Sequence, residues 1–172
     1  MLAYKADAAG NLTGGTVWWT GDAGELMNAQ NFDTGRLIAT MKDDGTKIAF
    51  RFGNLSATQQ GYLTSESVLN YLRGERANEV QNSGSMRQRI SVLGDIVHSR
   101  PFYVADATNP TVFVGANDGM LHAIDASNDA TTGGRERWAY VPSMLLPKMK
   151  NLTANPYVHD YYVDGQINIA KI

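Results

Sequence analysis

The segment from Val112 to Val141 constrains the fold of this chain more than any other part of the sequence. Short apolar or alternating runs at its start, at Met120–Ile124 and at Arg135–Val141 predict three consecutive strands. The first turn between them is Asn117-Asp118-Gly119, which contains residues that adopt a positive φ at little cost. The segment therefore predicts an antiparallel meander.

The second turn adds an aromatic anchor to this meander. Asp125 opens the turn, Thr132-Gly133-Gly134 closes it, and Trp138 follows in the third strand. A meander of this size, with Asp, Thr-Gly and Trp in this order, is typical of one blade of a β-propeller. A blade cannot bury both of its faces alone, so the pattern predicts contact with further sheets.

Composition agrees with a folded domain and excludes several classes of partner. The chain has 172 residues, of which 43% are hydrophobic and 19% charged, enough to form a core. Fifteen basic residues against 17 acidic ones provide no basic surface for nucleic acid or an anionic membrane. No apolar run is long enough for a transmembrane helix. The absence of cysteine excludes disulfides, thiolate metal sites and cysteine nucleophiles.

The first residues, Met1–Asp7, predict a strand and lack the features of a signal peptide. This leaves two alternatives open: a cytosolic protein, or a piece whose real N-terminus lies upstream.

The sequence predicts further hairpins on both sides of the meander, and strand Phe102–Ala105 directly before it. The second hairpin turns at Asp43-Asp44-Gly45, and the last one turns at Asp164-Gly165. The paired strands are Leu2–Asp7 with Thr16–Thr20, Arg36–Met41 with Lys47–Phe52, and Tyr161–Asp164 with Gln166–Ile172.

Helical segments are short and few. Thr64–Gly74 predicts a helix with Thr64 or Ser65 as its N-cap and Gly74 after its end. Gly24–Asn28 predicts one helical turn, and Pro142–Lys150 predicts a short helix that begins at proline. Ala77–Met86 is polar and predicts an exposed loop.

The resulting fold class is mainly β: a partial β-propeller of antiparallel meanders and hairpins with one or two short helices. A closed propeller needs at least four blades of about 40 to 45 residues. The chain contains one convincing blade and the start of another, so we expect either a fragment of a propeller or a different fold.

Several uncommon strings follow one another in the second half of the chain. They are Gly94-Asp95-Ile96-Val97-His98-Ser99-Arg100-Pro101, the meander, Val141-Pro142-Ser143-Met144-Leu145-Leu146-Pro147 and Tyr161-Tyr162-Val163-Asp164-Gly165. Upstream, Trp19, Tyr71-Leu72-Arg73-Gly74 and Arg87 agree with the same order. Together these strings resemble the PilC/PilY family of type IV pilus tip-associated proteins, and the resemblance covers nearly the whole chain.

The resemblance implies a large exported protein whose C-terminal half is a modified β-propeller of the quinoprotein type. It implies that residues 1–93 form a hairpin and short-helix segment leading into the propeller. Residues 94–172 would then form the first blade and the incomplete start of the next. The structural residues of this interpretation are Gly94, Asp95, His98, Pro101, Asn117, Asp118, Gly119, Asp125, Gly133, Trp138, Asp164 and Gly165.

The family also implies a function at the cell surface. Its members act in pilus assembly, oppose pilus retraction and can serve as tip adhesins. The implied partners are major or minor pilin subunits, host-cell surface molecules and the remaining blades of the longer protein. The implied location is the outer membrane, the cell surface or the pilus tip.

We expect no catalytic, cofactor or metal residue in this segment. The family's calcium loop has Asp at alternating positions, and the nearest segments, 42–45 and 125–129, lack this pattern and a closing Glu. Calcium binding elsewhere in the longer protein stays open. His98, Asp95 and Ser99 lie too close in sequence to align as a triad, so we expect His98 and Asp95 to bind backbone groups.

Other side chains have structural interpretations. His122 is expected to be packed or half-exposed, and His159-Asp160 to be a loop pair, because the histidine spacing fits no metal site. Arg135-Glu136-Arg137 and Lys148-Met149-Lys150 are expected to be solvated. One ring of Trp18-Trp19 is expected in the core, and packing is favoured over ligand stacking for the other.

Three functions fit the sequence. The first is a non-enzymatic scaffold of a pilus biogenesis factor or tip adhesin. The second is a quinoprotein dehydrogenase, since the Asp125, Gly133 and Trp138 pattern also resembles the repeat of pyrroloquinoline-quinone enzymes. In that repeat the tryptophan docks between blades, so we assign Trp138 a structural role. The third is a generic propeller module that binds an unrelated protein.

Overall fold

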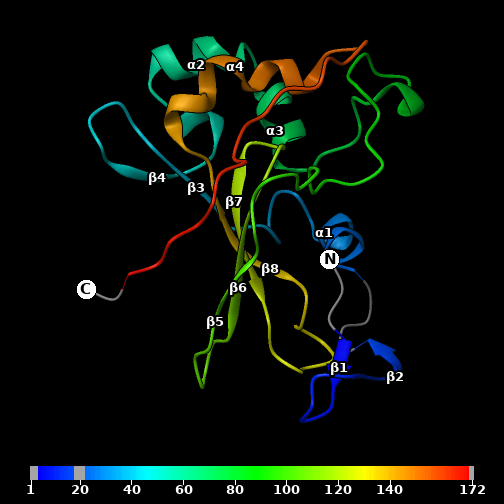
Figure 1. The fold of residues 1–172 in the computed structure, drawn as a ribbon. Helices are drawn as coiled ribbons and strands as arrows, with labels where there is room; N and C mark the ends of the chain where they lie inside the picture. The colour runs from blue at the N-terminus through cyan, green and yellow to red at the C-terminus, as the bar shows by residue number, and fades with distance from the viewer. Residues whose placement is uncertain (1–3, 18–21, 171–172) are drawn as a thin grey trace.

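A six-stranded mixed sheet, in the order β4-β3-β8-β7-β6-β5, is the centre of the molecule (Figure 1). The structure is a computed structural model that describes residues 4–17 and 22–170. Four consecutive strands of the sheet form an antiparallel meander, which confirms the predicted blade. These strands are β5 (Phe102–Val104), β6 (Thr111–Ala116), β7 (Met120–Asp125) and β8 (Glu136–Tyr140).

The other two strands come from the first half of the chain. β3 (Ile38–Met41) and β4 (Lys47–Ala49) form the predicted hairpin, and β3 also pairs with β8 in parallel, with Ala39 opposite Tyr140. The sheet thus includes strands from both sides of residue 93. The division of the chain into 1–93 and 94–172 stays a prediction.

A second, two-stranded sheet forms an N-terminal hairpin as predicted, but its second strand begins at Leu12 and not at the expected Thr16. β1 (Tyr4–Ala6) and β2 (Leu12–Val17) are antiparallel and lie at the lower end of the molecule in Figure 1. The Asp7 carboxylate accepts hydrogen bonds from the backbone N–H of Ala9 and Asn11, which holds the turn. Trp18-Trp19, of which one ring was expected in the core, lies outside the described residues.

The described residues form four short α-helices. Three were predicted: α1 (Ala23–Ala29), α3 (Glu66–Arg73) and α4 (Leu146–Met149), the last flanked by 3-10 turns. Ser65 caps α3, and Gly74 follows it with a φ of 120°. The prediction missed α2 (Ala57–Leu63). Its start is fixed by a capping box, in which Ser56 and Gln59 bind each other's backbone N–H.

One face of the sheet is covered by the chain itself. At the upper end, α2, α3 and α4 pack on Met120, Ala139 and Val141. Further along the same face, Ala23 of α1 packs against Val114 and Ile124. Figure 1 shows the helices α2–α4 gathered above the sheet and α1 beside it.

Two segments differ from the prediction. Ala77–Met86 is not simply exposed, because Glu79 is fully buried and accepts a 2.8 Å hydrogen bond from Arg89 Nε. The predicted hairpin of Tyr161–Asp164 with residues 166–172 is wrong for the described residues, since residues 157–170 form no strand. This segment instead forms hydrogen bonds with residues 95–98. Asp164 accepts from the His98 backbone N–H, and His159 binds the Asp95 carboxylate, so distant polar groups and not a second strand hold the segment.

Candidate functional site

The turn between β6 and β7 is bonded to the Gly94-Asp95 string. Gly94 N donates to Asp118 Oδ2 over 2.8 Å, and Asn117 N donates to the Asp95 carbonyl over 3.0 Å. A Cβ at Gly94 would lie 2.9 Å from the Asn117 carbonyl carbon and closer still to Asp118 N. Gly119 has a φ of 93°, as the turn prediction required. The structure therefore brings two of the predicted motifs together.

Residues 157–165 cross this turn and tie a third motif to it. His98 binds Asp164 through both its backbone N–H and its ring Nδ1, and Tyr162 N donates to Asn117 Oδ1 over 3.0 Å. His159 Nε2 lies 2.9 Å from Asp95 Oδ2. The side chain of His98 thus binds a side chain and not the expected backbone group, whereas the Asp95 carboxylate binds two side chains as well as a backbone N–H.

This geometry also separates the residues that could have formed a triad. Ser99 Oγ accepts a hydrogen bond from Gly115 N, while Asp95 binds Asn117 and His159. Pro101 is exposed directly before β5, and Gly165 is exposed, with room for a Cβ that would meet no atom within 4 Å. Pro101 and Gly165 were expected to be structural residues of the 94–101 and 161–165 strings. Within the described part of the chain, neither residue makes a contact that supports this role.

A network of buried charged side chains lies on the covered face of the sheet; it consists of Arg36, Asp118, His122 and Glu136. Arg36 Nε and Nη2 donate to the two oxygens of Glu136, over 2.7 and 2.8 Å. His122 Nδ1 lies 2.7 Å from Glu136 Oε1, and its Nε2 lies 3.1 Å from both Asp118 oxygens. The expectation that Arg135-Glu136-Arg137 is solvated is wrong at its centre, because the Glu136 side chain is fully buried. A β-bulge between Ala123 and Ile124 accompanies this register.

Opposite charges stabilise the ionised forms of this network. Burial opposes charge on His122, but Asp118 and Glu136 raise the pKa of its imidazole to about 9. Burial likewise opposes ionisation of Glu136, but hydrogen bonds from Arg36 and His122 lower its pKa to about 2. Of the two predicted alternatives, packed or half-exposed, His122 is the packed one. With this raised pKa its imidazole is positively charged at neutral pH.

The second turn of the meander is closed by Gly134, the last residue of the predicted Thr132-Gly133-Gly134 closure. Gly134 has a φ of 84° and donates to the Asp125 carbonyl over 2.8 Å. Gly133 N donates to the Asp129 carbonyl and does not have a positive φ. Asp125 also forms an ion pair of 2.9 Å with Arg137. Asp125 and Gly134 therefore hold this loop against the end of β7, whereas Gly133 bonds within the loop.

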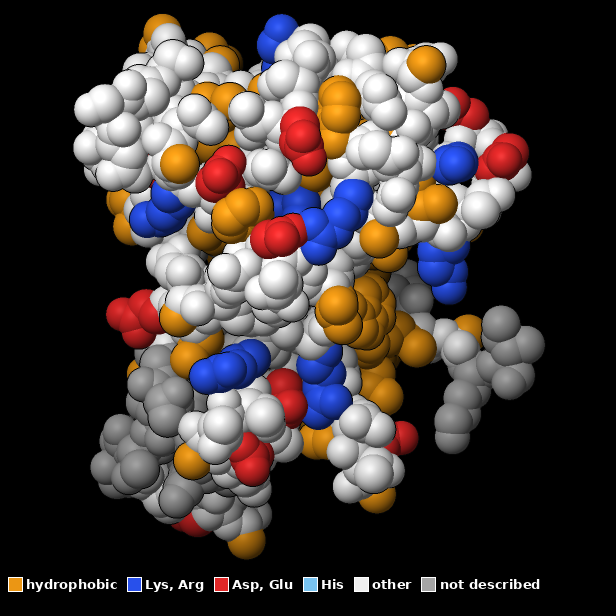
Figure 2. Space-filling model, turned by 180° about the vertical axis from the view of Figure 1, so that it is seen from behind, with side chains coloured by type: hydrophobic (Ala, Val, Ile, Leu, Met, Phe, Trp, Pro, Cys, Tyr) orange, Lys and Arg blue, Asp and Glu red, His pale blue; other side chains and the backbone are white. Residues whose placement is uncertain are grey.

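The second face of the sheet carries aromatic and aliphatic side chains that are partly exposed. Trp138 is opposite Ala123, which is opposite Phe113, and the Trp138 and Phe113 rings are 5.7 Å apart. Trp138 is 40% exposed and Leu37 is 69% exposed. They border a shallow apolar hollow with a volume of about 680 Å³. Seen from behind, hydrophobic side chains gather in a patch below the helical layer (Figure 2).

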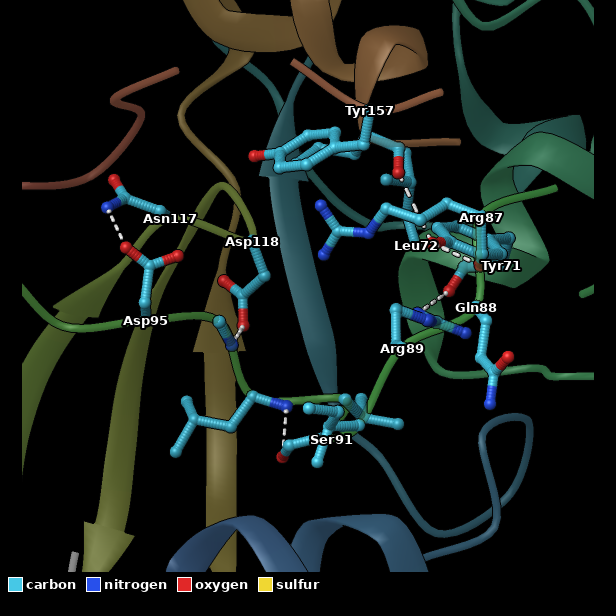
Figure 3. Close-up of a pocket in the computed structure, with 15 residues that line it drawn as sticks. Tyr71, Leu72, Arg87, Gln88, Arg89, Ser91, Asp95, Asn117, Asp118 and Tyr157 are labelled. Carbon is cyan, nitrogen blue, oxygen red and sulfur yellow. Dashed lines mark hydrogen bonds between the residues drawn. The ribbon is translucent and has the colours of Figure 1, made fainter. Parts of the chain in front are cut away.

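A separate pocket of about 530 Å³ lies between the end of α3 and the β6–β7 turn (Figure 3). Its front is formed by residues 87–95, here called the strap. Arg89 fixes the strap by donating to the Tyr71 and Glu75 carbonyls over 2.7 and 2.6 Å. Val92 N donates to Asn28 Oδ1 over 2.7 Å. The sequence did not predict this pocket, since its walls come from four separate segments.

The described residues contain neither a cluster of potential metal ligands nor a helix that could span a membrane. Across residues 4–17 and 22–170, no group of three or more His, Asp or Glu side chains is placed to hold a metal ion. None of the described helices is long and apolar enough to cross a membrane.

The fold defines the class of protein. A four-stranded antiparallel meander, with a tryptophan on its uncovered face, is the architecture of a β-propeller blade. The family model for the PilY1 beta-propeller domain matches residues 82–172. The chain belongs to this PilY1 family, which confirms the resemblance seen in its sequence.

Curated relatives carry the same family name. The chain is 37% identical over 159 residues to a type IV pilus biogenesis factor PilY1 homolog of Xylella fastidiosa, covering 78% of this chain. It is 35% identical over 213 residues to the type IV pilus biogenesis factor PilY1 of Pseudomonas aeruginosa strain PAK, covering 99% of this chain. The chain spans only 12% and 17% of the lengths of these two relatives. No solved structure matches the chain.

Proposed function

We propose that this chain is a scaffold part of a type IV pilus biogenesis factor, in which its sheet is one blade of a β-propeller. The observation that carries this proposal is the difference between the two faces of the sheet. One face is covered by helices α1–α4, whereas the other carries the exposed Trp138 and the half-buried Phe113. Antiparallel sheets pack face to face through such side chains.

The exposed face therefore receives a neighbouring sheet of the same longer protein. The aromatic pair of Phe113 and Trp138 supplies a large apolar area with defined ring geometry. Because the opposite face is already covered, this blade has one face available for a neighbour. This supports the structural role predicted for Trp138.

The partners and location follow from the family. The relatives are named as pilus biogenesis factors, so we propose export to the cell surface and contact with major or minor pilin subunits. We extend this proposal to adhesion of the protein to host-cell surfaces. Loops on a rigid β scaffold are the parts that would make such contacts.

We propose that the role is non-enzymatic. The side chains that could have formed a triad bind other groups: His98 binds Asp164, and Ser99 accepts from Gly115 N. The buried His122 and Glu136 are shielded from solvent and saturated with hydrogen bonds. The alternative, a quinoprotein dehydrogenase, would use residues outside this chain.

Piliation of the source cell tests the proposal. The gene that encodes this chain is deleted, then restored with either the unchanged gene or Trp138→Ser, and surface pili are counted. We expect loss of pili on deletion, full restoration by the unchanged gene and poor restoration by Trp138→Ser. Tyr62→Ser on α2, which removes an aromatic side chain that is also 40% exposed but lies away from this face, is the matched control and should restore pili fully.

Normal piliation after deletion would contradict the pilus role. Quinone-dependent dye reduction by the purified longer protein would favour the dehydrogenase instead. Full restoration by Trp138→Ser, with an unchanged amount of protein, would contradict the assignment of the exposed face.

A further inference from the structure

The pocket behind the strap contains an arginine without an acidic partner. Arg87 lines the pocket, with its Cζ 3.7 Å from the centroid of the Tyr157 ring. Figure 3 shows its guanidinium pointing into the space between Tyr157 and Asp118. Among residues 4–17 and 22–170, no carboxylate lies within ion-pair distance of Arg87.

Arg89, two residues along the strap, has a carboxylate partner and carbonyl acceptors for its guanidinium, whereas Arg87 has no carboxylate partner among the described residues. Arg89 pairs with the buried Glu79 at 2.8 Å, donates to two backbone carbonyls and stacks on the Tyr71 ring at 3.6 Å. Arg89 therefore holds the fold together. Arg87 shares one side-chain hydrogen bond with Tyr71 but has no carboxylate partner among the described residues, so its remaining donors are available to a ligand in the pocket.

The rest of the pocket wall is largely apolar. Leu72, Val92 and Leu152 are buried beneath it, and Ile90 stands on its rim with 98% of its surface exposed. The backbone N–H groups of Ile90 and Ser91 donate no hydrogen bond within the described part of the chain. The strap thus offers an apolar contact and free backbone donors beside a cation.

We propose that this pocket binds an extended peptide segment that places one carboxylate on the guanidinium of Arg87 and an apolar side chain beside Ile90. A guanidinium stacked on an aromatic ring still presents its edge to a carboxylate, which it can bind through two parallel hydrogen bonds. The free N–H groups of the strap pair with the peptide backbone, as an edge strand would. This site is independent of the sheet face in the proposed function.

The acidic groups of the pocket restrict the ligand. Asp118 is occupied by His122 and Gly94 N, and Asp95 is occupied by Asn117 and His159. Both carboxylates repel a second negative charge in their vicinity. The site therefore selects a peptide with a single carboxylate rather than a polyacidic segment.

Peptide binding to the 172-residue chain tests the proposal. The probes are three fluorescently labelled heptapeptides with leucines on both sides of the central position. One has a central glutamate and an amidated C-terminus, one has glutamine there, and one has glutamine with a free C-terminal carboxylate. We expect at least one carboxylate peptide to bind about tenfold more tightly than the neutral peptide. The tighter of the two shows whether a side chain or a chain terminus supplies the carboxylate.

Variants connect this preference to Arg87. Arg87→Gln should remove the tenfold preference, while Arg87→Lys should keep part of it, because lysine retains charge but not the planar fork. Arg100→Gln removes an exposed arginine outside the pocket and is the matched control. Thermal melting of each variant shows that it is folded.

Chemical-shift mapping on the unchanged protein provides a test that needs no variant. The glutamate peptide should shift the amide signals of Arg87–Asp95, Asp118 and Tyr157. The proposal is overturned by equal affinity for all three peptides, by an equal loss with Arg100→Gln, or by shifts confined to β3 and β8.

Discussion

His122 and Glu136 face each other on neighbouring strands, with His122 Nδ1 2.7 Å from Glu136 Oε1 and both side chains fully buried. Arg36, in the segment before β3, donates hydrogen bonds to both carboxylate oxygens of Glu136. A buried carboxylate that binds a guanidinium and an imidazolium ties three distant parts of the sequence together. This network also reaches Asp118, and through it Gly94 of the strap.

Alkaline pH should destabilise the chain through His122. Its pKa is raised to about 9 in the fold, so its stabilising contribution is complete below the unfolded value, about 6.5, and is lost as pH rises through 9. We expect the free energy of unfolding at pH 9.5 to be lower than at pH 6 by on the order of 2–3 kcal/mol. Urea unfolding at both pH values measures this difference. His122→Gln should flatten the dependence; an unchanged slope in that variant would assign it to other groups.

Removing the carboxylate of Glu136 should cost more than removing an exposed one. Glu136→Gln leaves Arg36 and His122 buried without their anion, so we expect a loss of about 3–5 kcal/mol in the free energy of unfolding. Glu66→Gln, at the exposed start of α3, should cost less than about 0.5 kcal/mol. Chemical denaturation of both variants checks this, and similar losses for both would contradict the network's role.

Gly94 and Gly165 should respond differently to the same substitution. Gly94→Ala forces a Cβ into the backbone of Asn117 and Asp118, so we expect a loss of roughly 1–3 kcal/mol. Gly165→Ala places its Cβ in open space at a φ that alanine tolerates, so we expect no loss. Thermal melting of the two variants measures the difference. A Gly94→Ala variant as stable as the unchanged chain would show that the turn and the string are not in tight contact.

The contact of His98 with Asp164 should hold residues 157–165 in place without supporting the core. Asp164→Ala removes the acceptor of two hydrogen bonds, so amide exchange in this segment should become faster while the melting temperature stays nearly constant. Asn168→Ala, three residues beyond this segment, is the control. Equal exchange rates in the two variants would mean that this contact does not anchor the segment.

Local sequence features predicted the elements that depend on nearby residues. The meander, its Gly119 turn, the β3–β4 hairpin and the Ser65-capped helix all depend on side chains within a few positions. The helix α2 was missed because it is short and only weakly apolar, although Ser56 and Gln59 form a capping box that could have revealed it. The hairpin at Asp164-Gly165 was predicted from turn residues alone, whereas Asp164 instead binds His98 across 66 positions.

The sequence by itself determined that this chain contains a propeller-type meander and belongs with the pilus biogenesis factors, because strand periodicity, turn residues and uncommon strings are local information. Only the tertiary structure decided which charged residues are buried, as Glu136 stands between two arginines in a stretch that looks solvated. It also decided that β3 pairs with β8 and that Arg87 faces a pocket. The physical reason is that burial and ion pairing depend on contacts between residues far apart in the sequence, such as Arg36 and Glu136 at a separation of 100 positions, and no local pattern encodes such a contact.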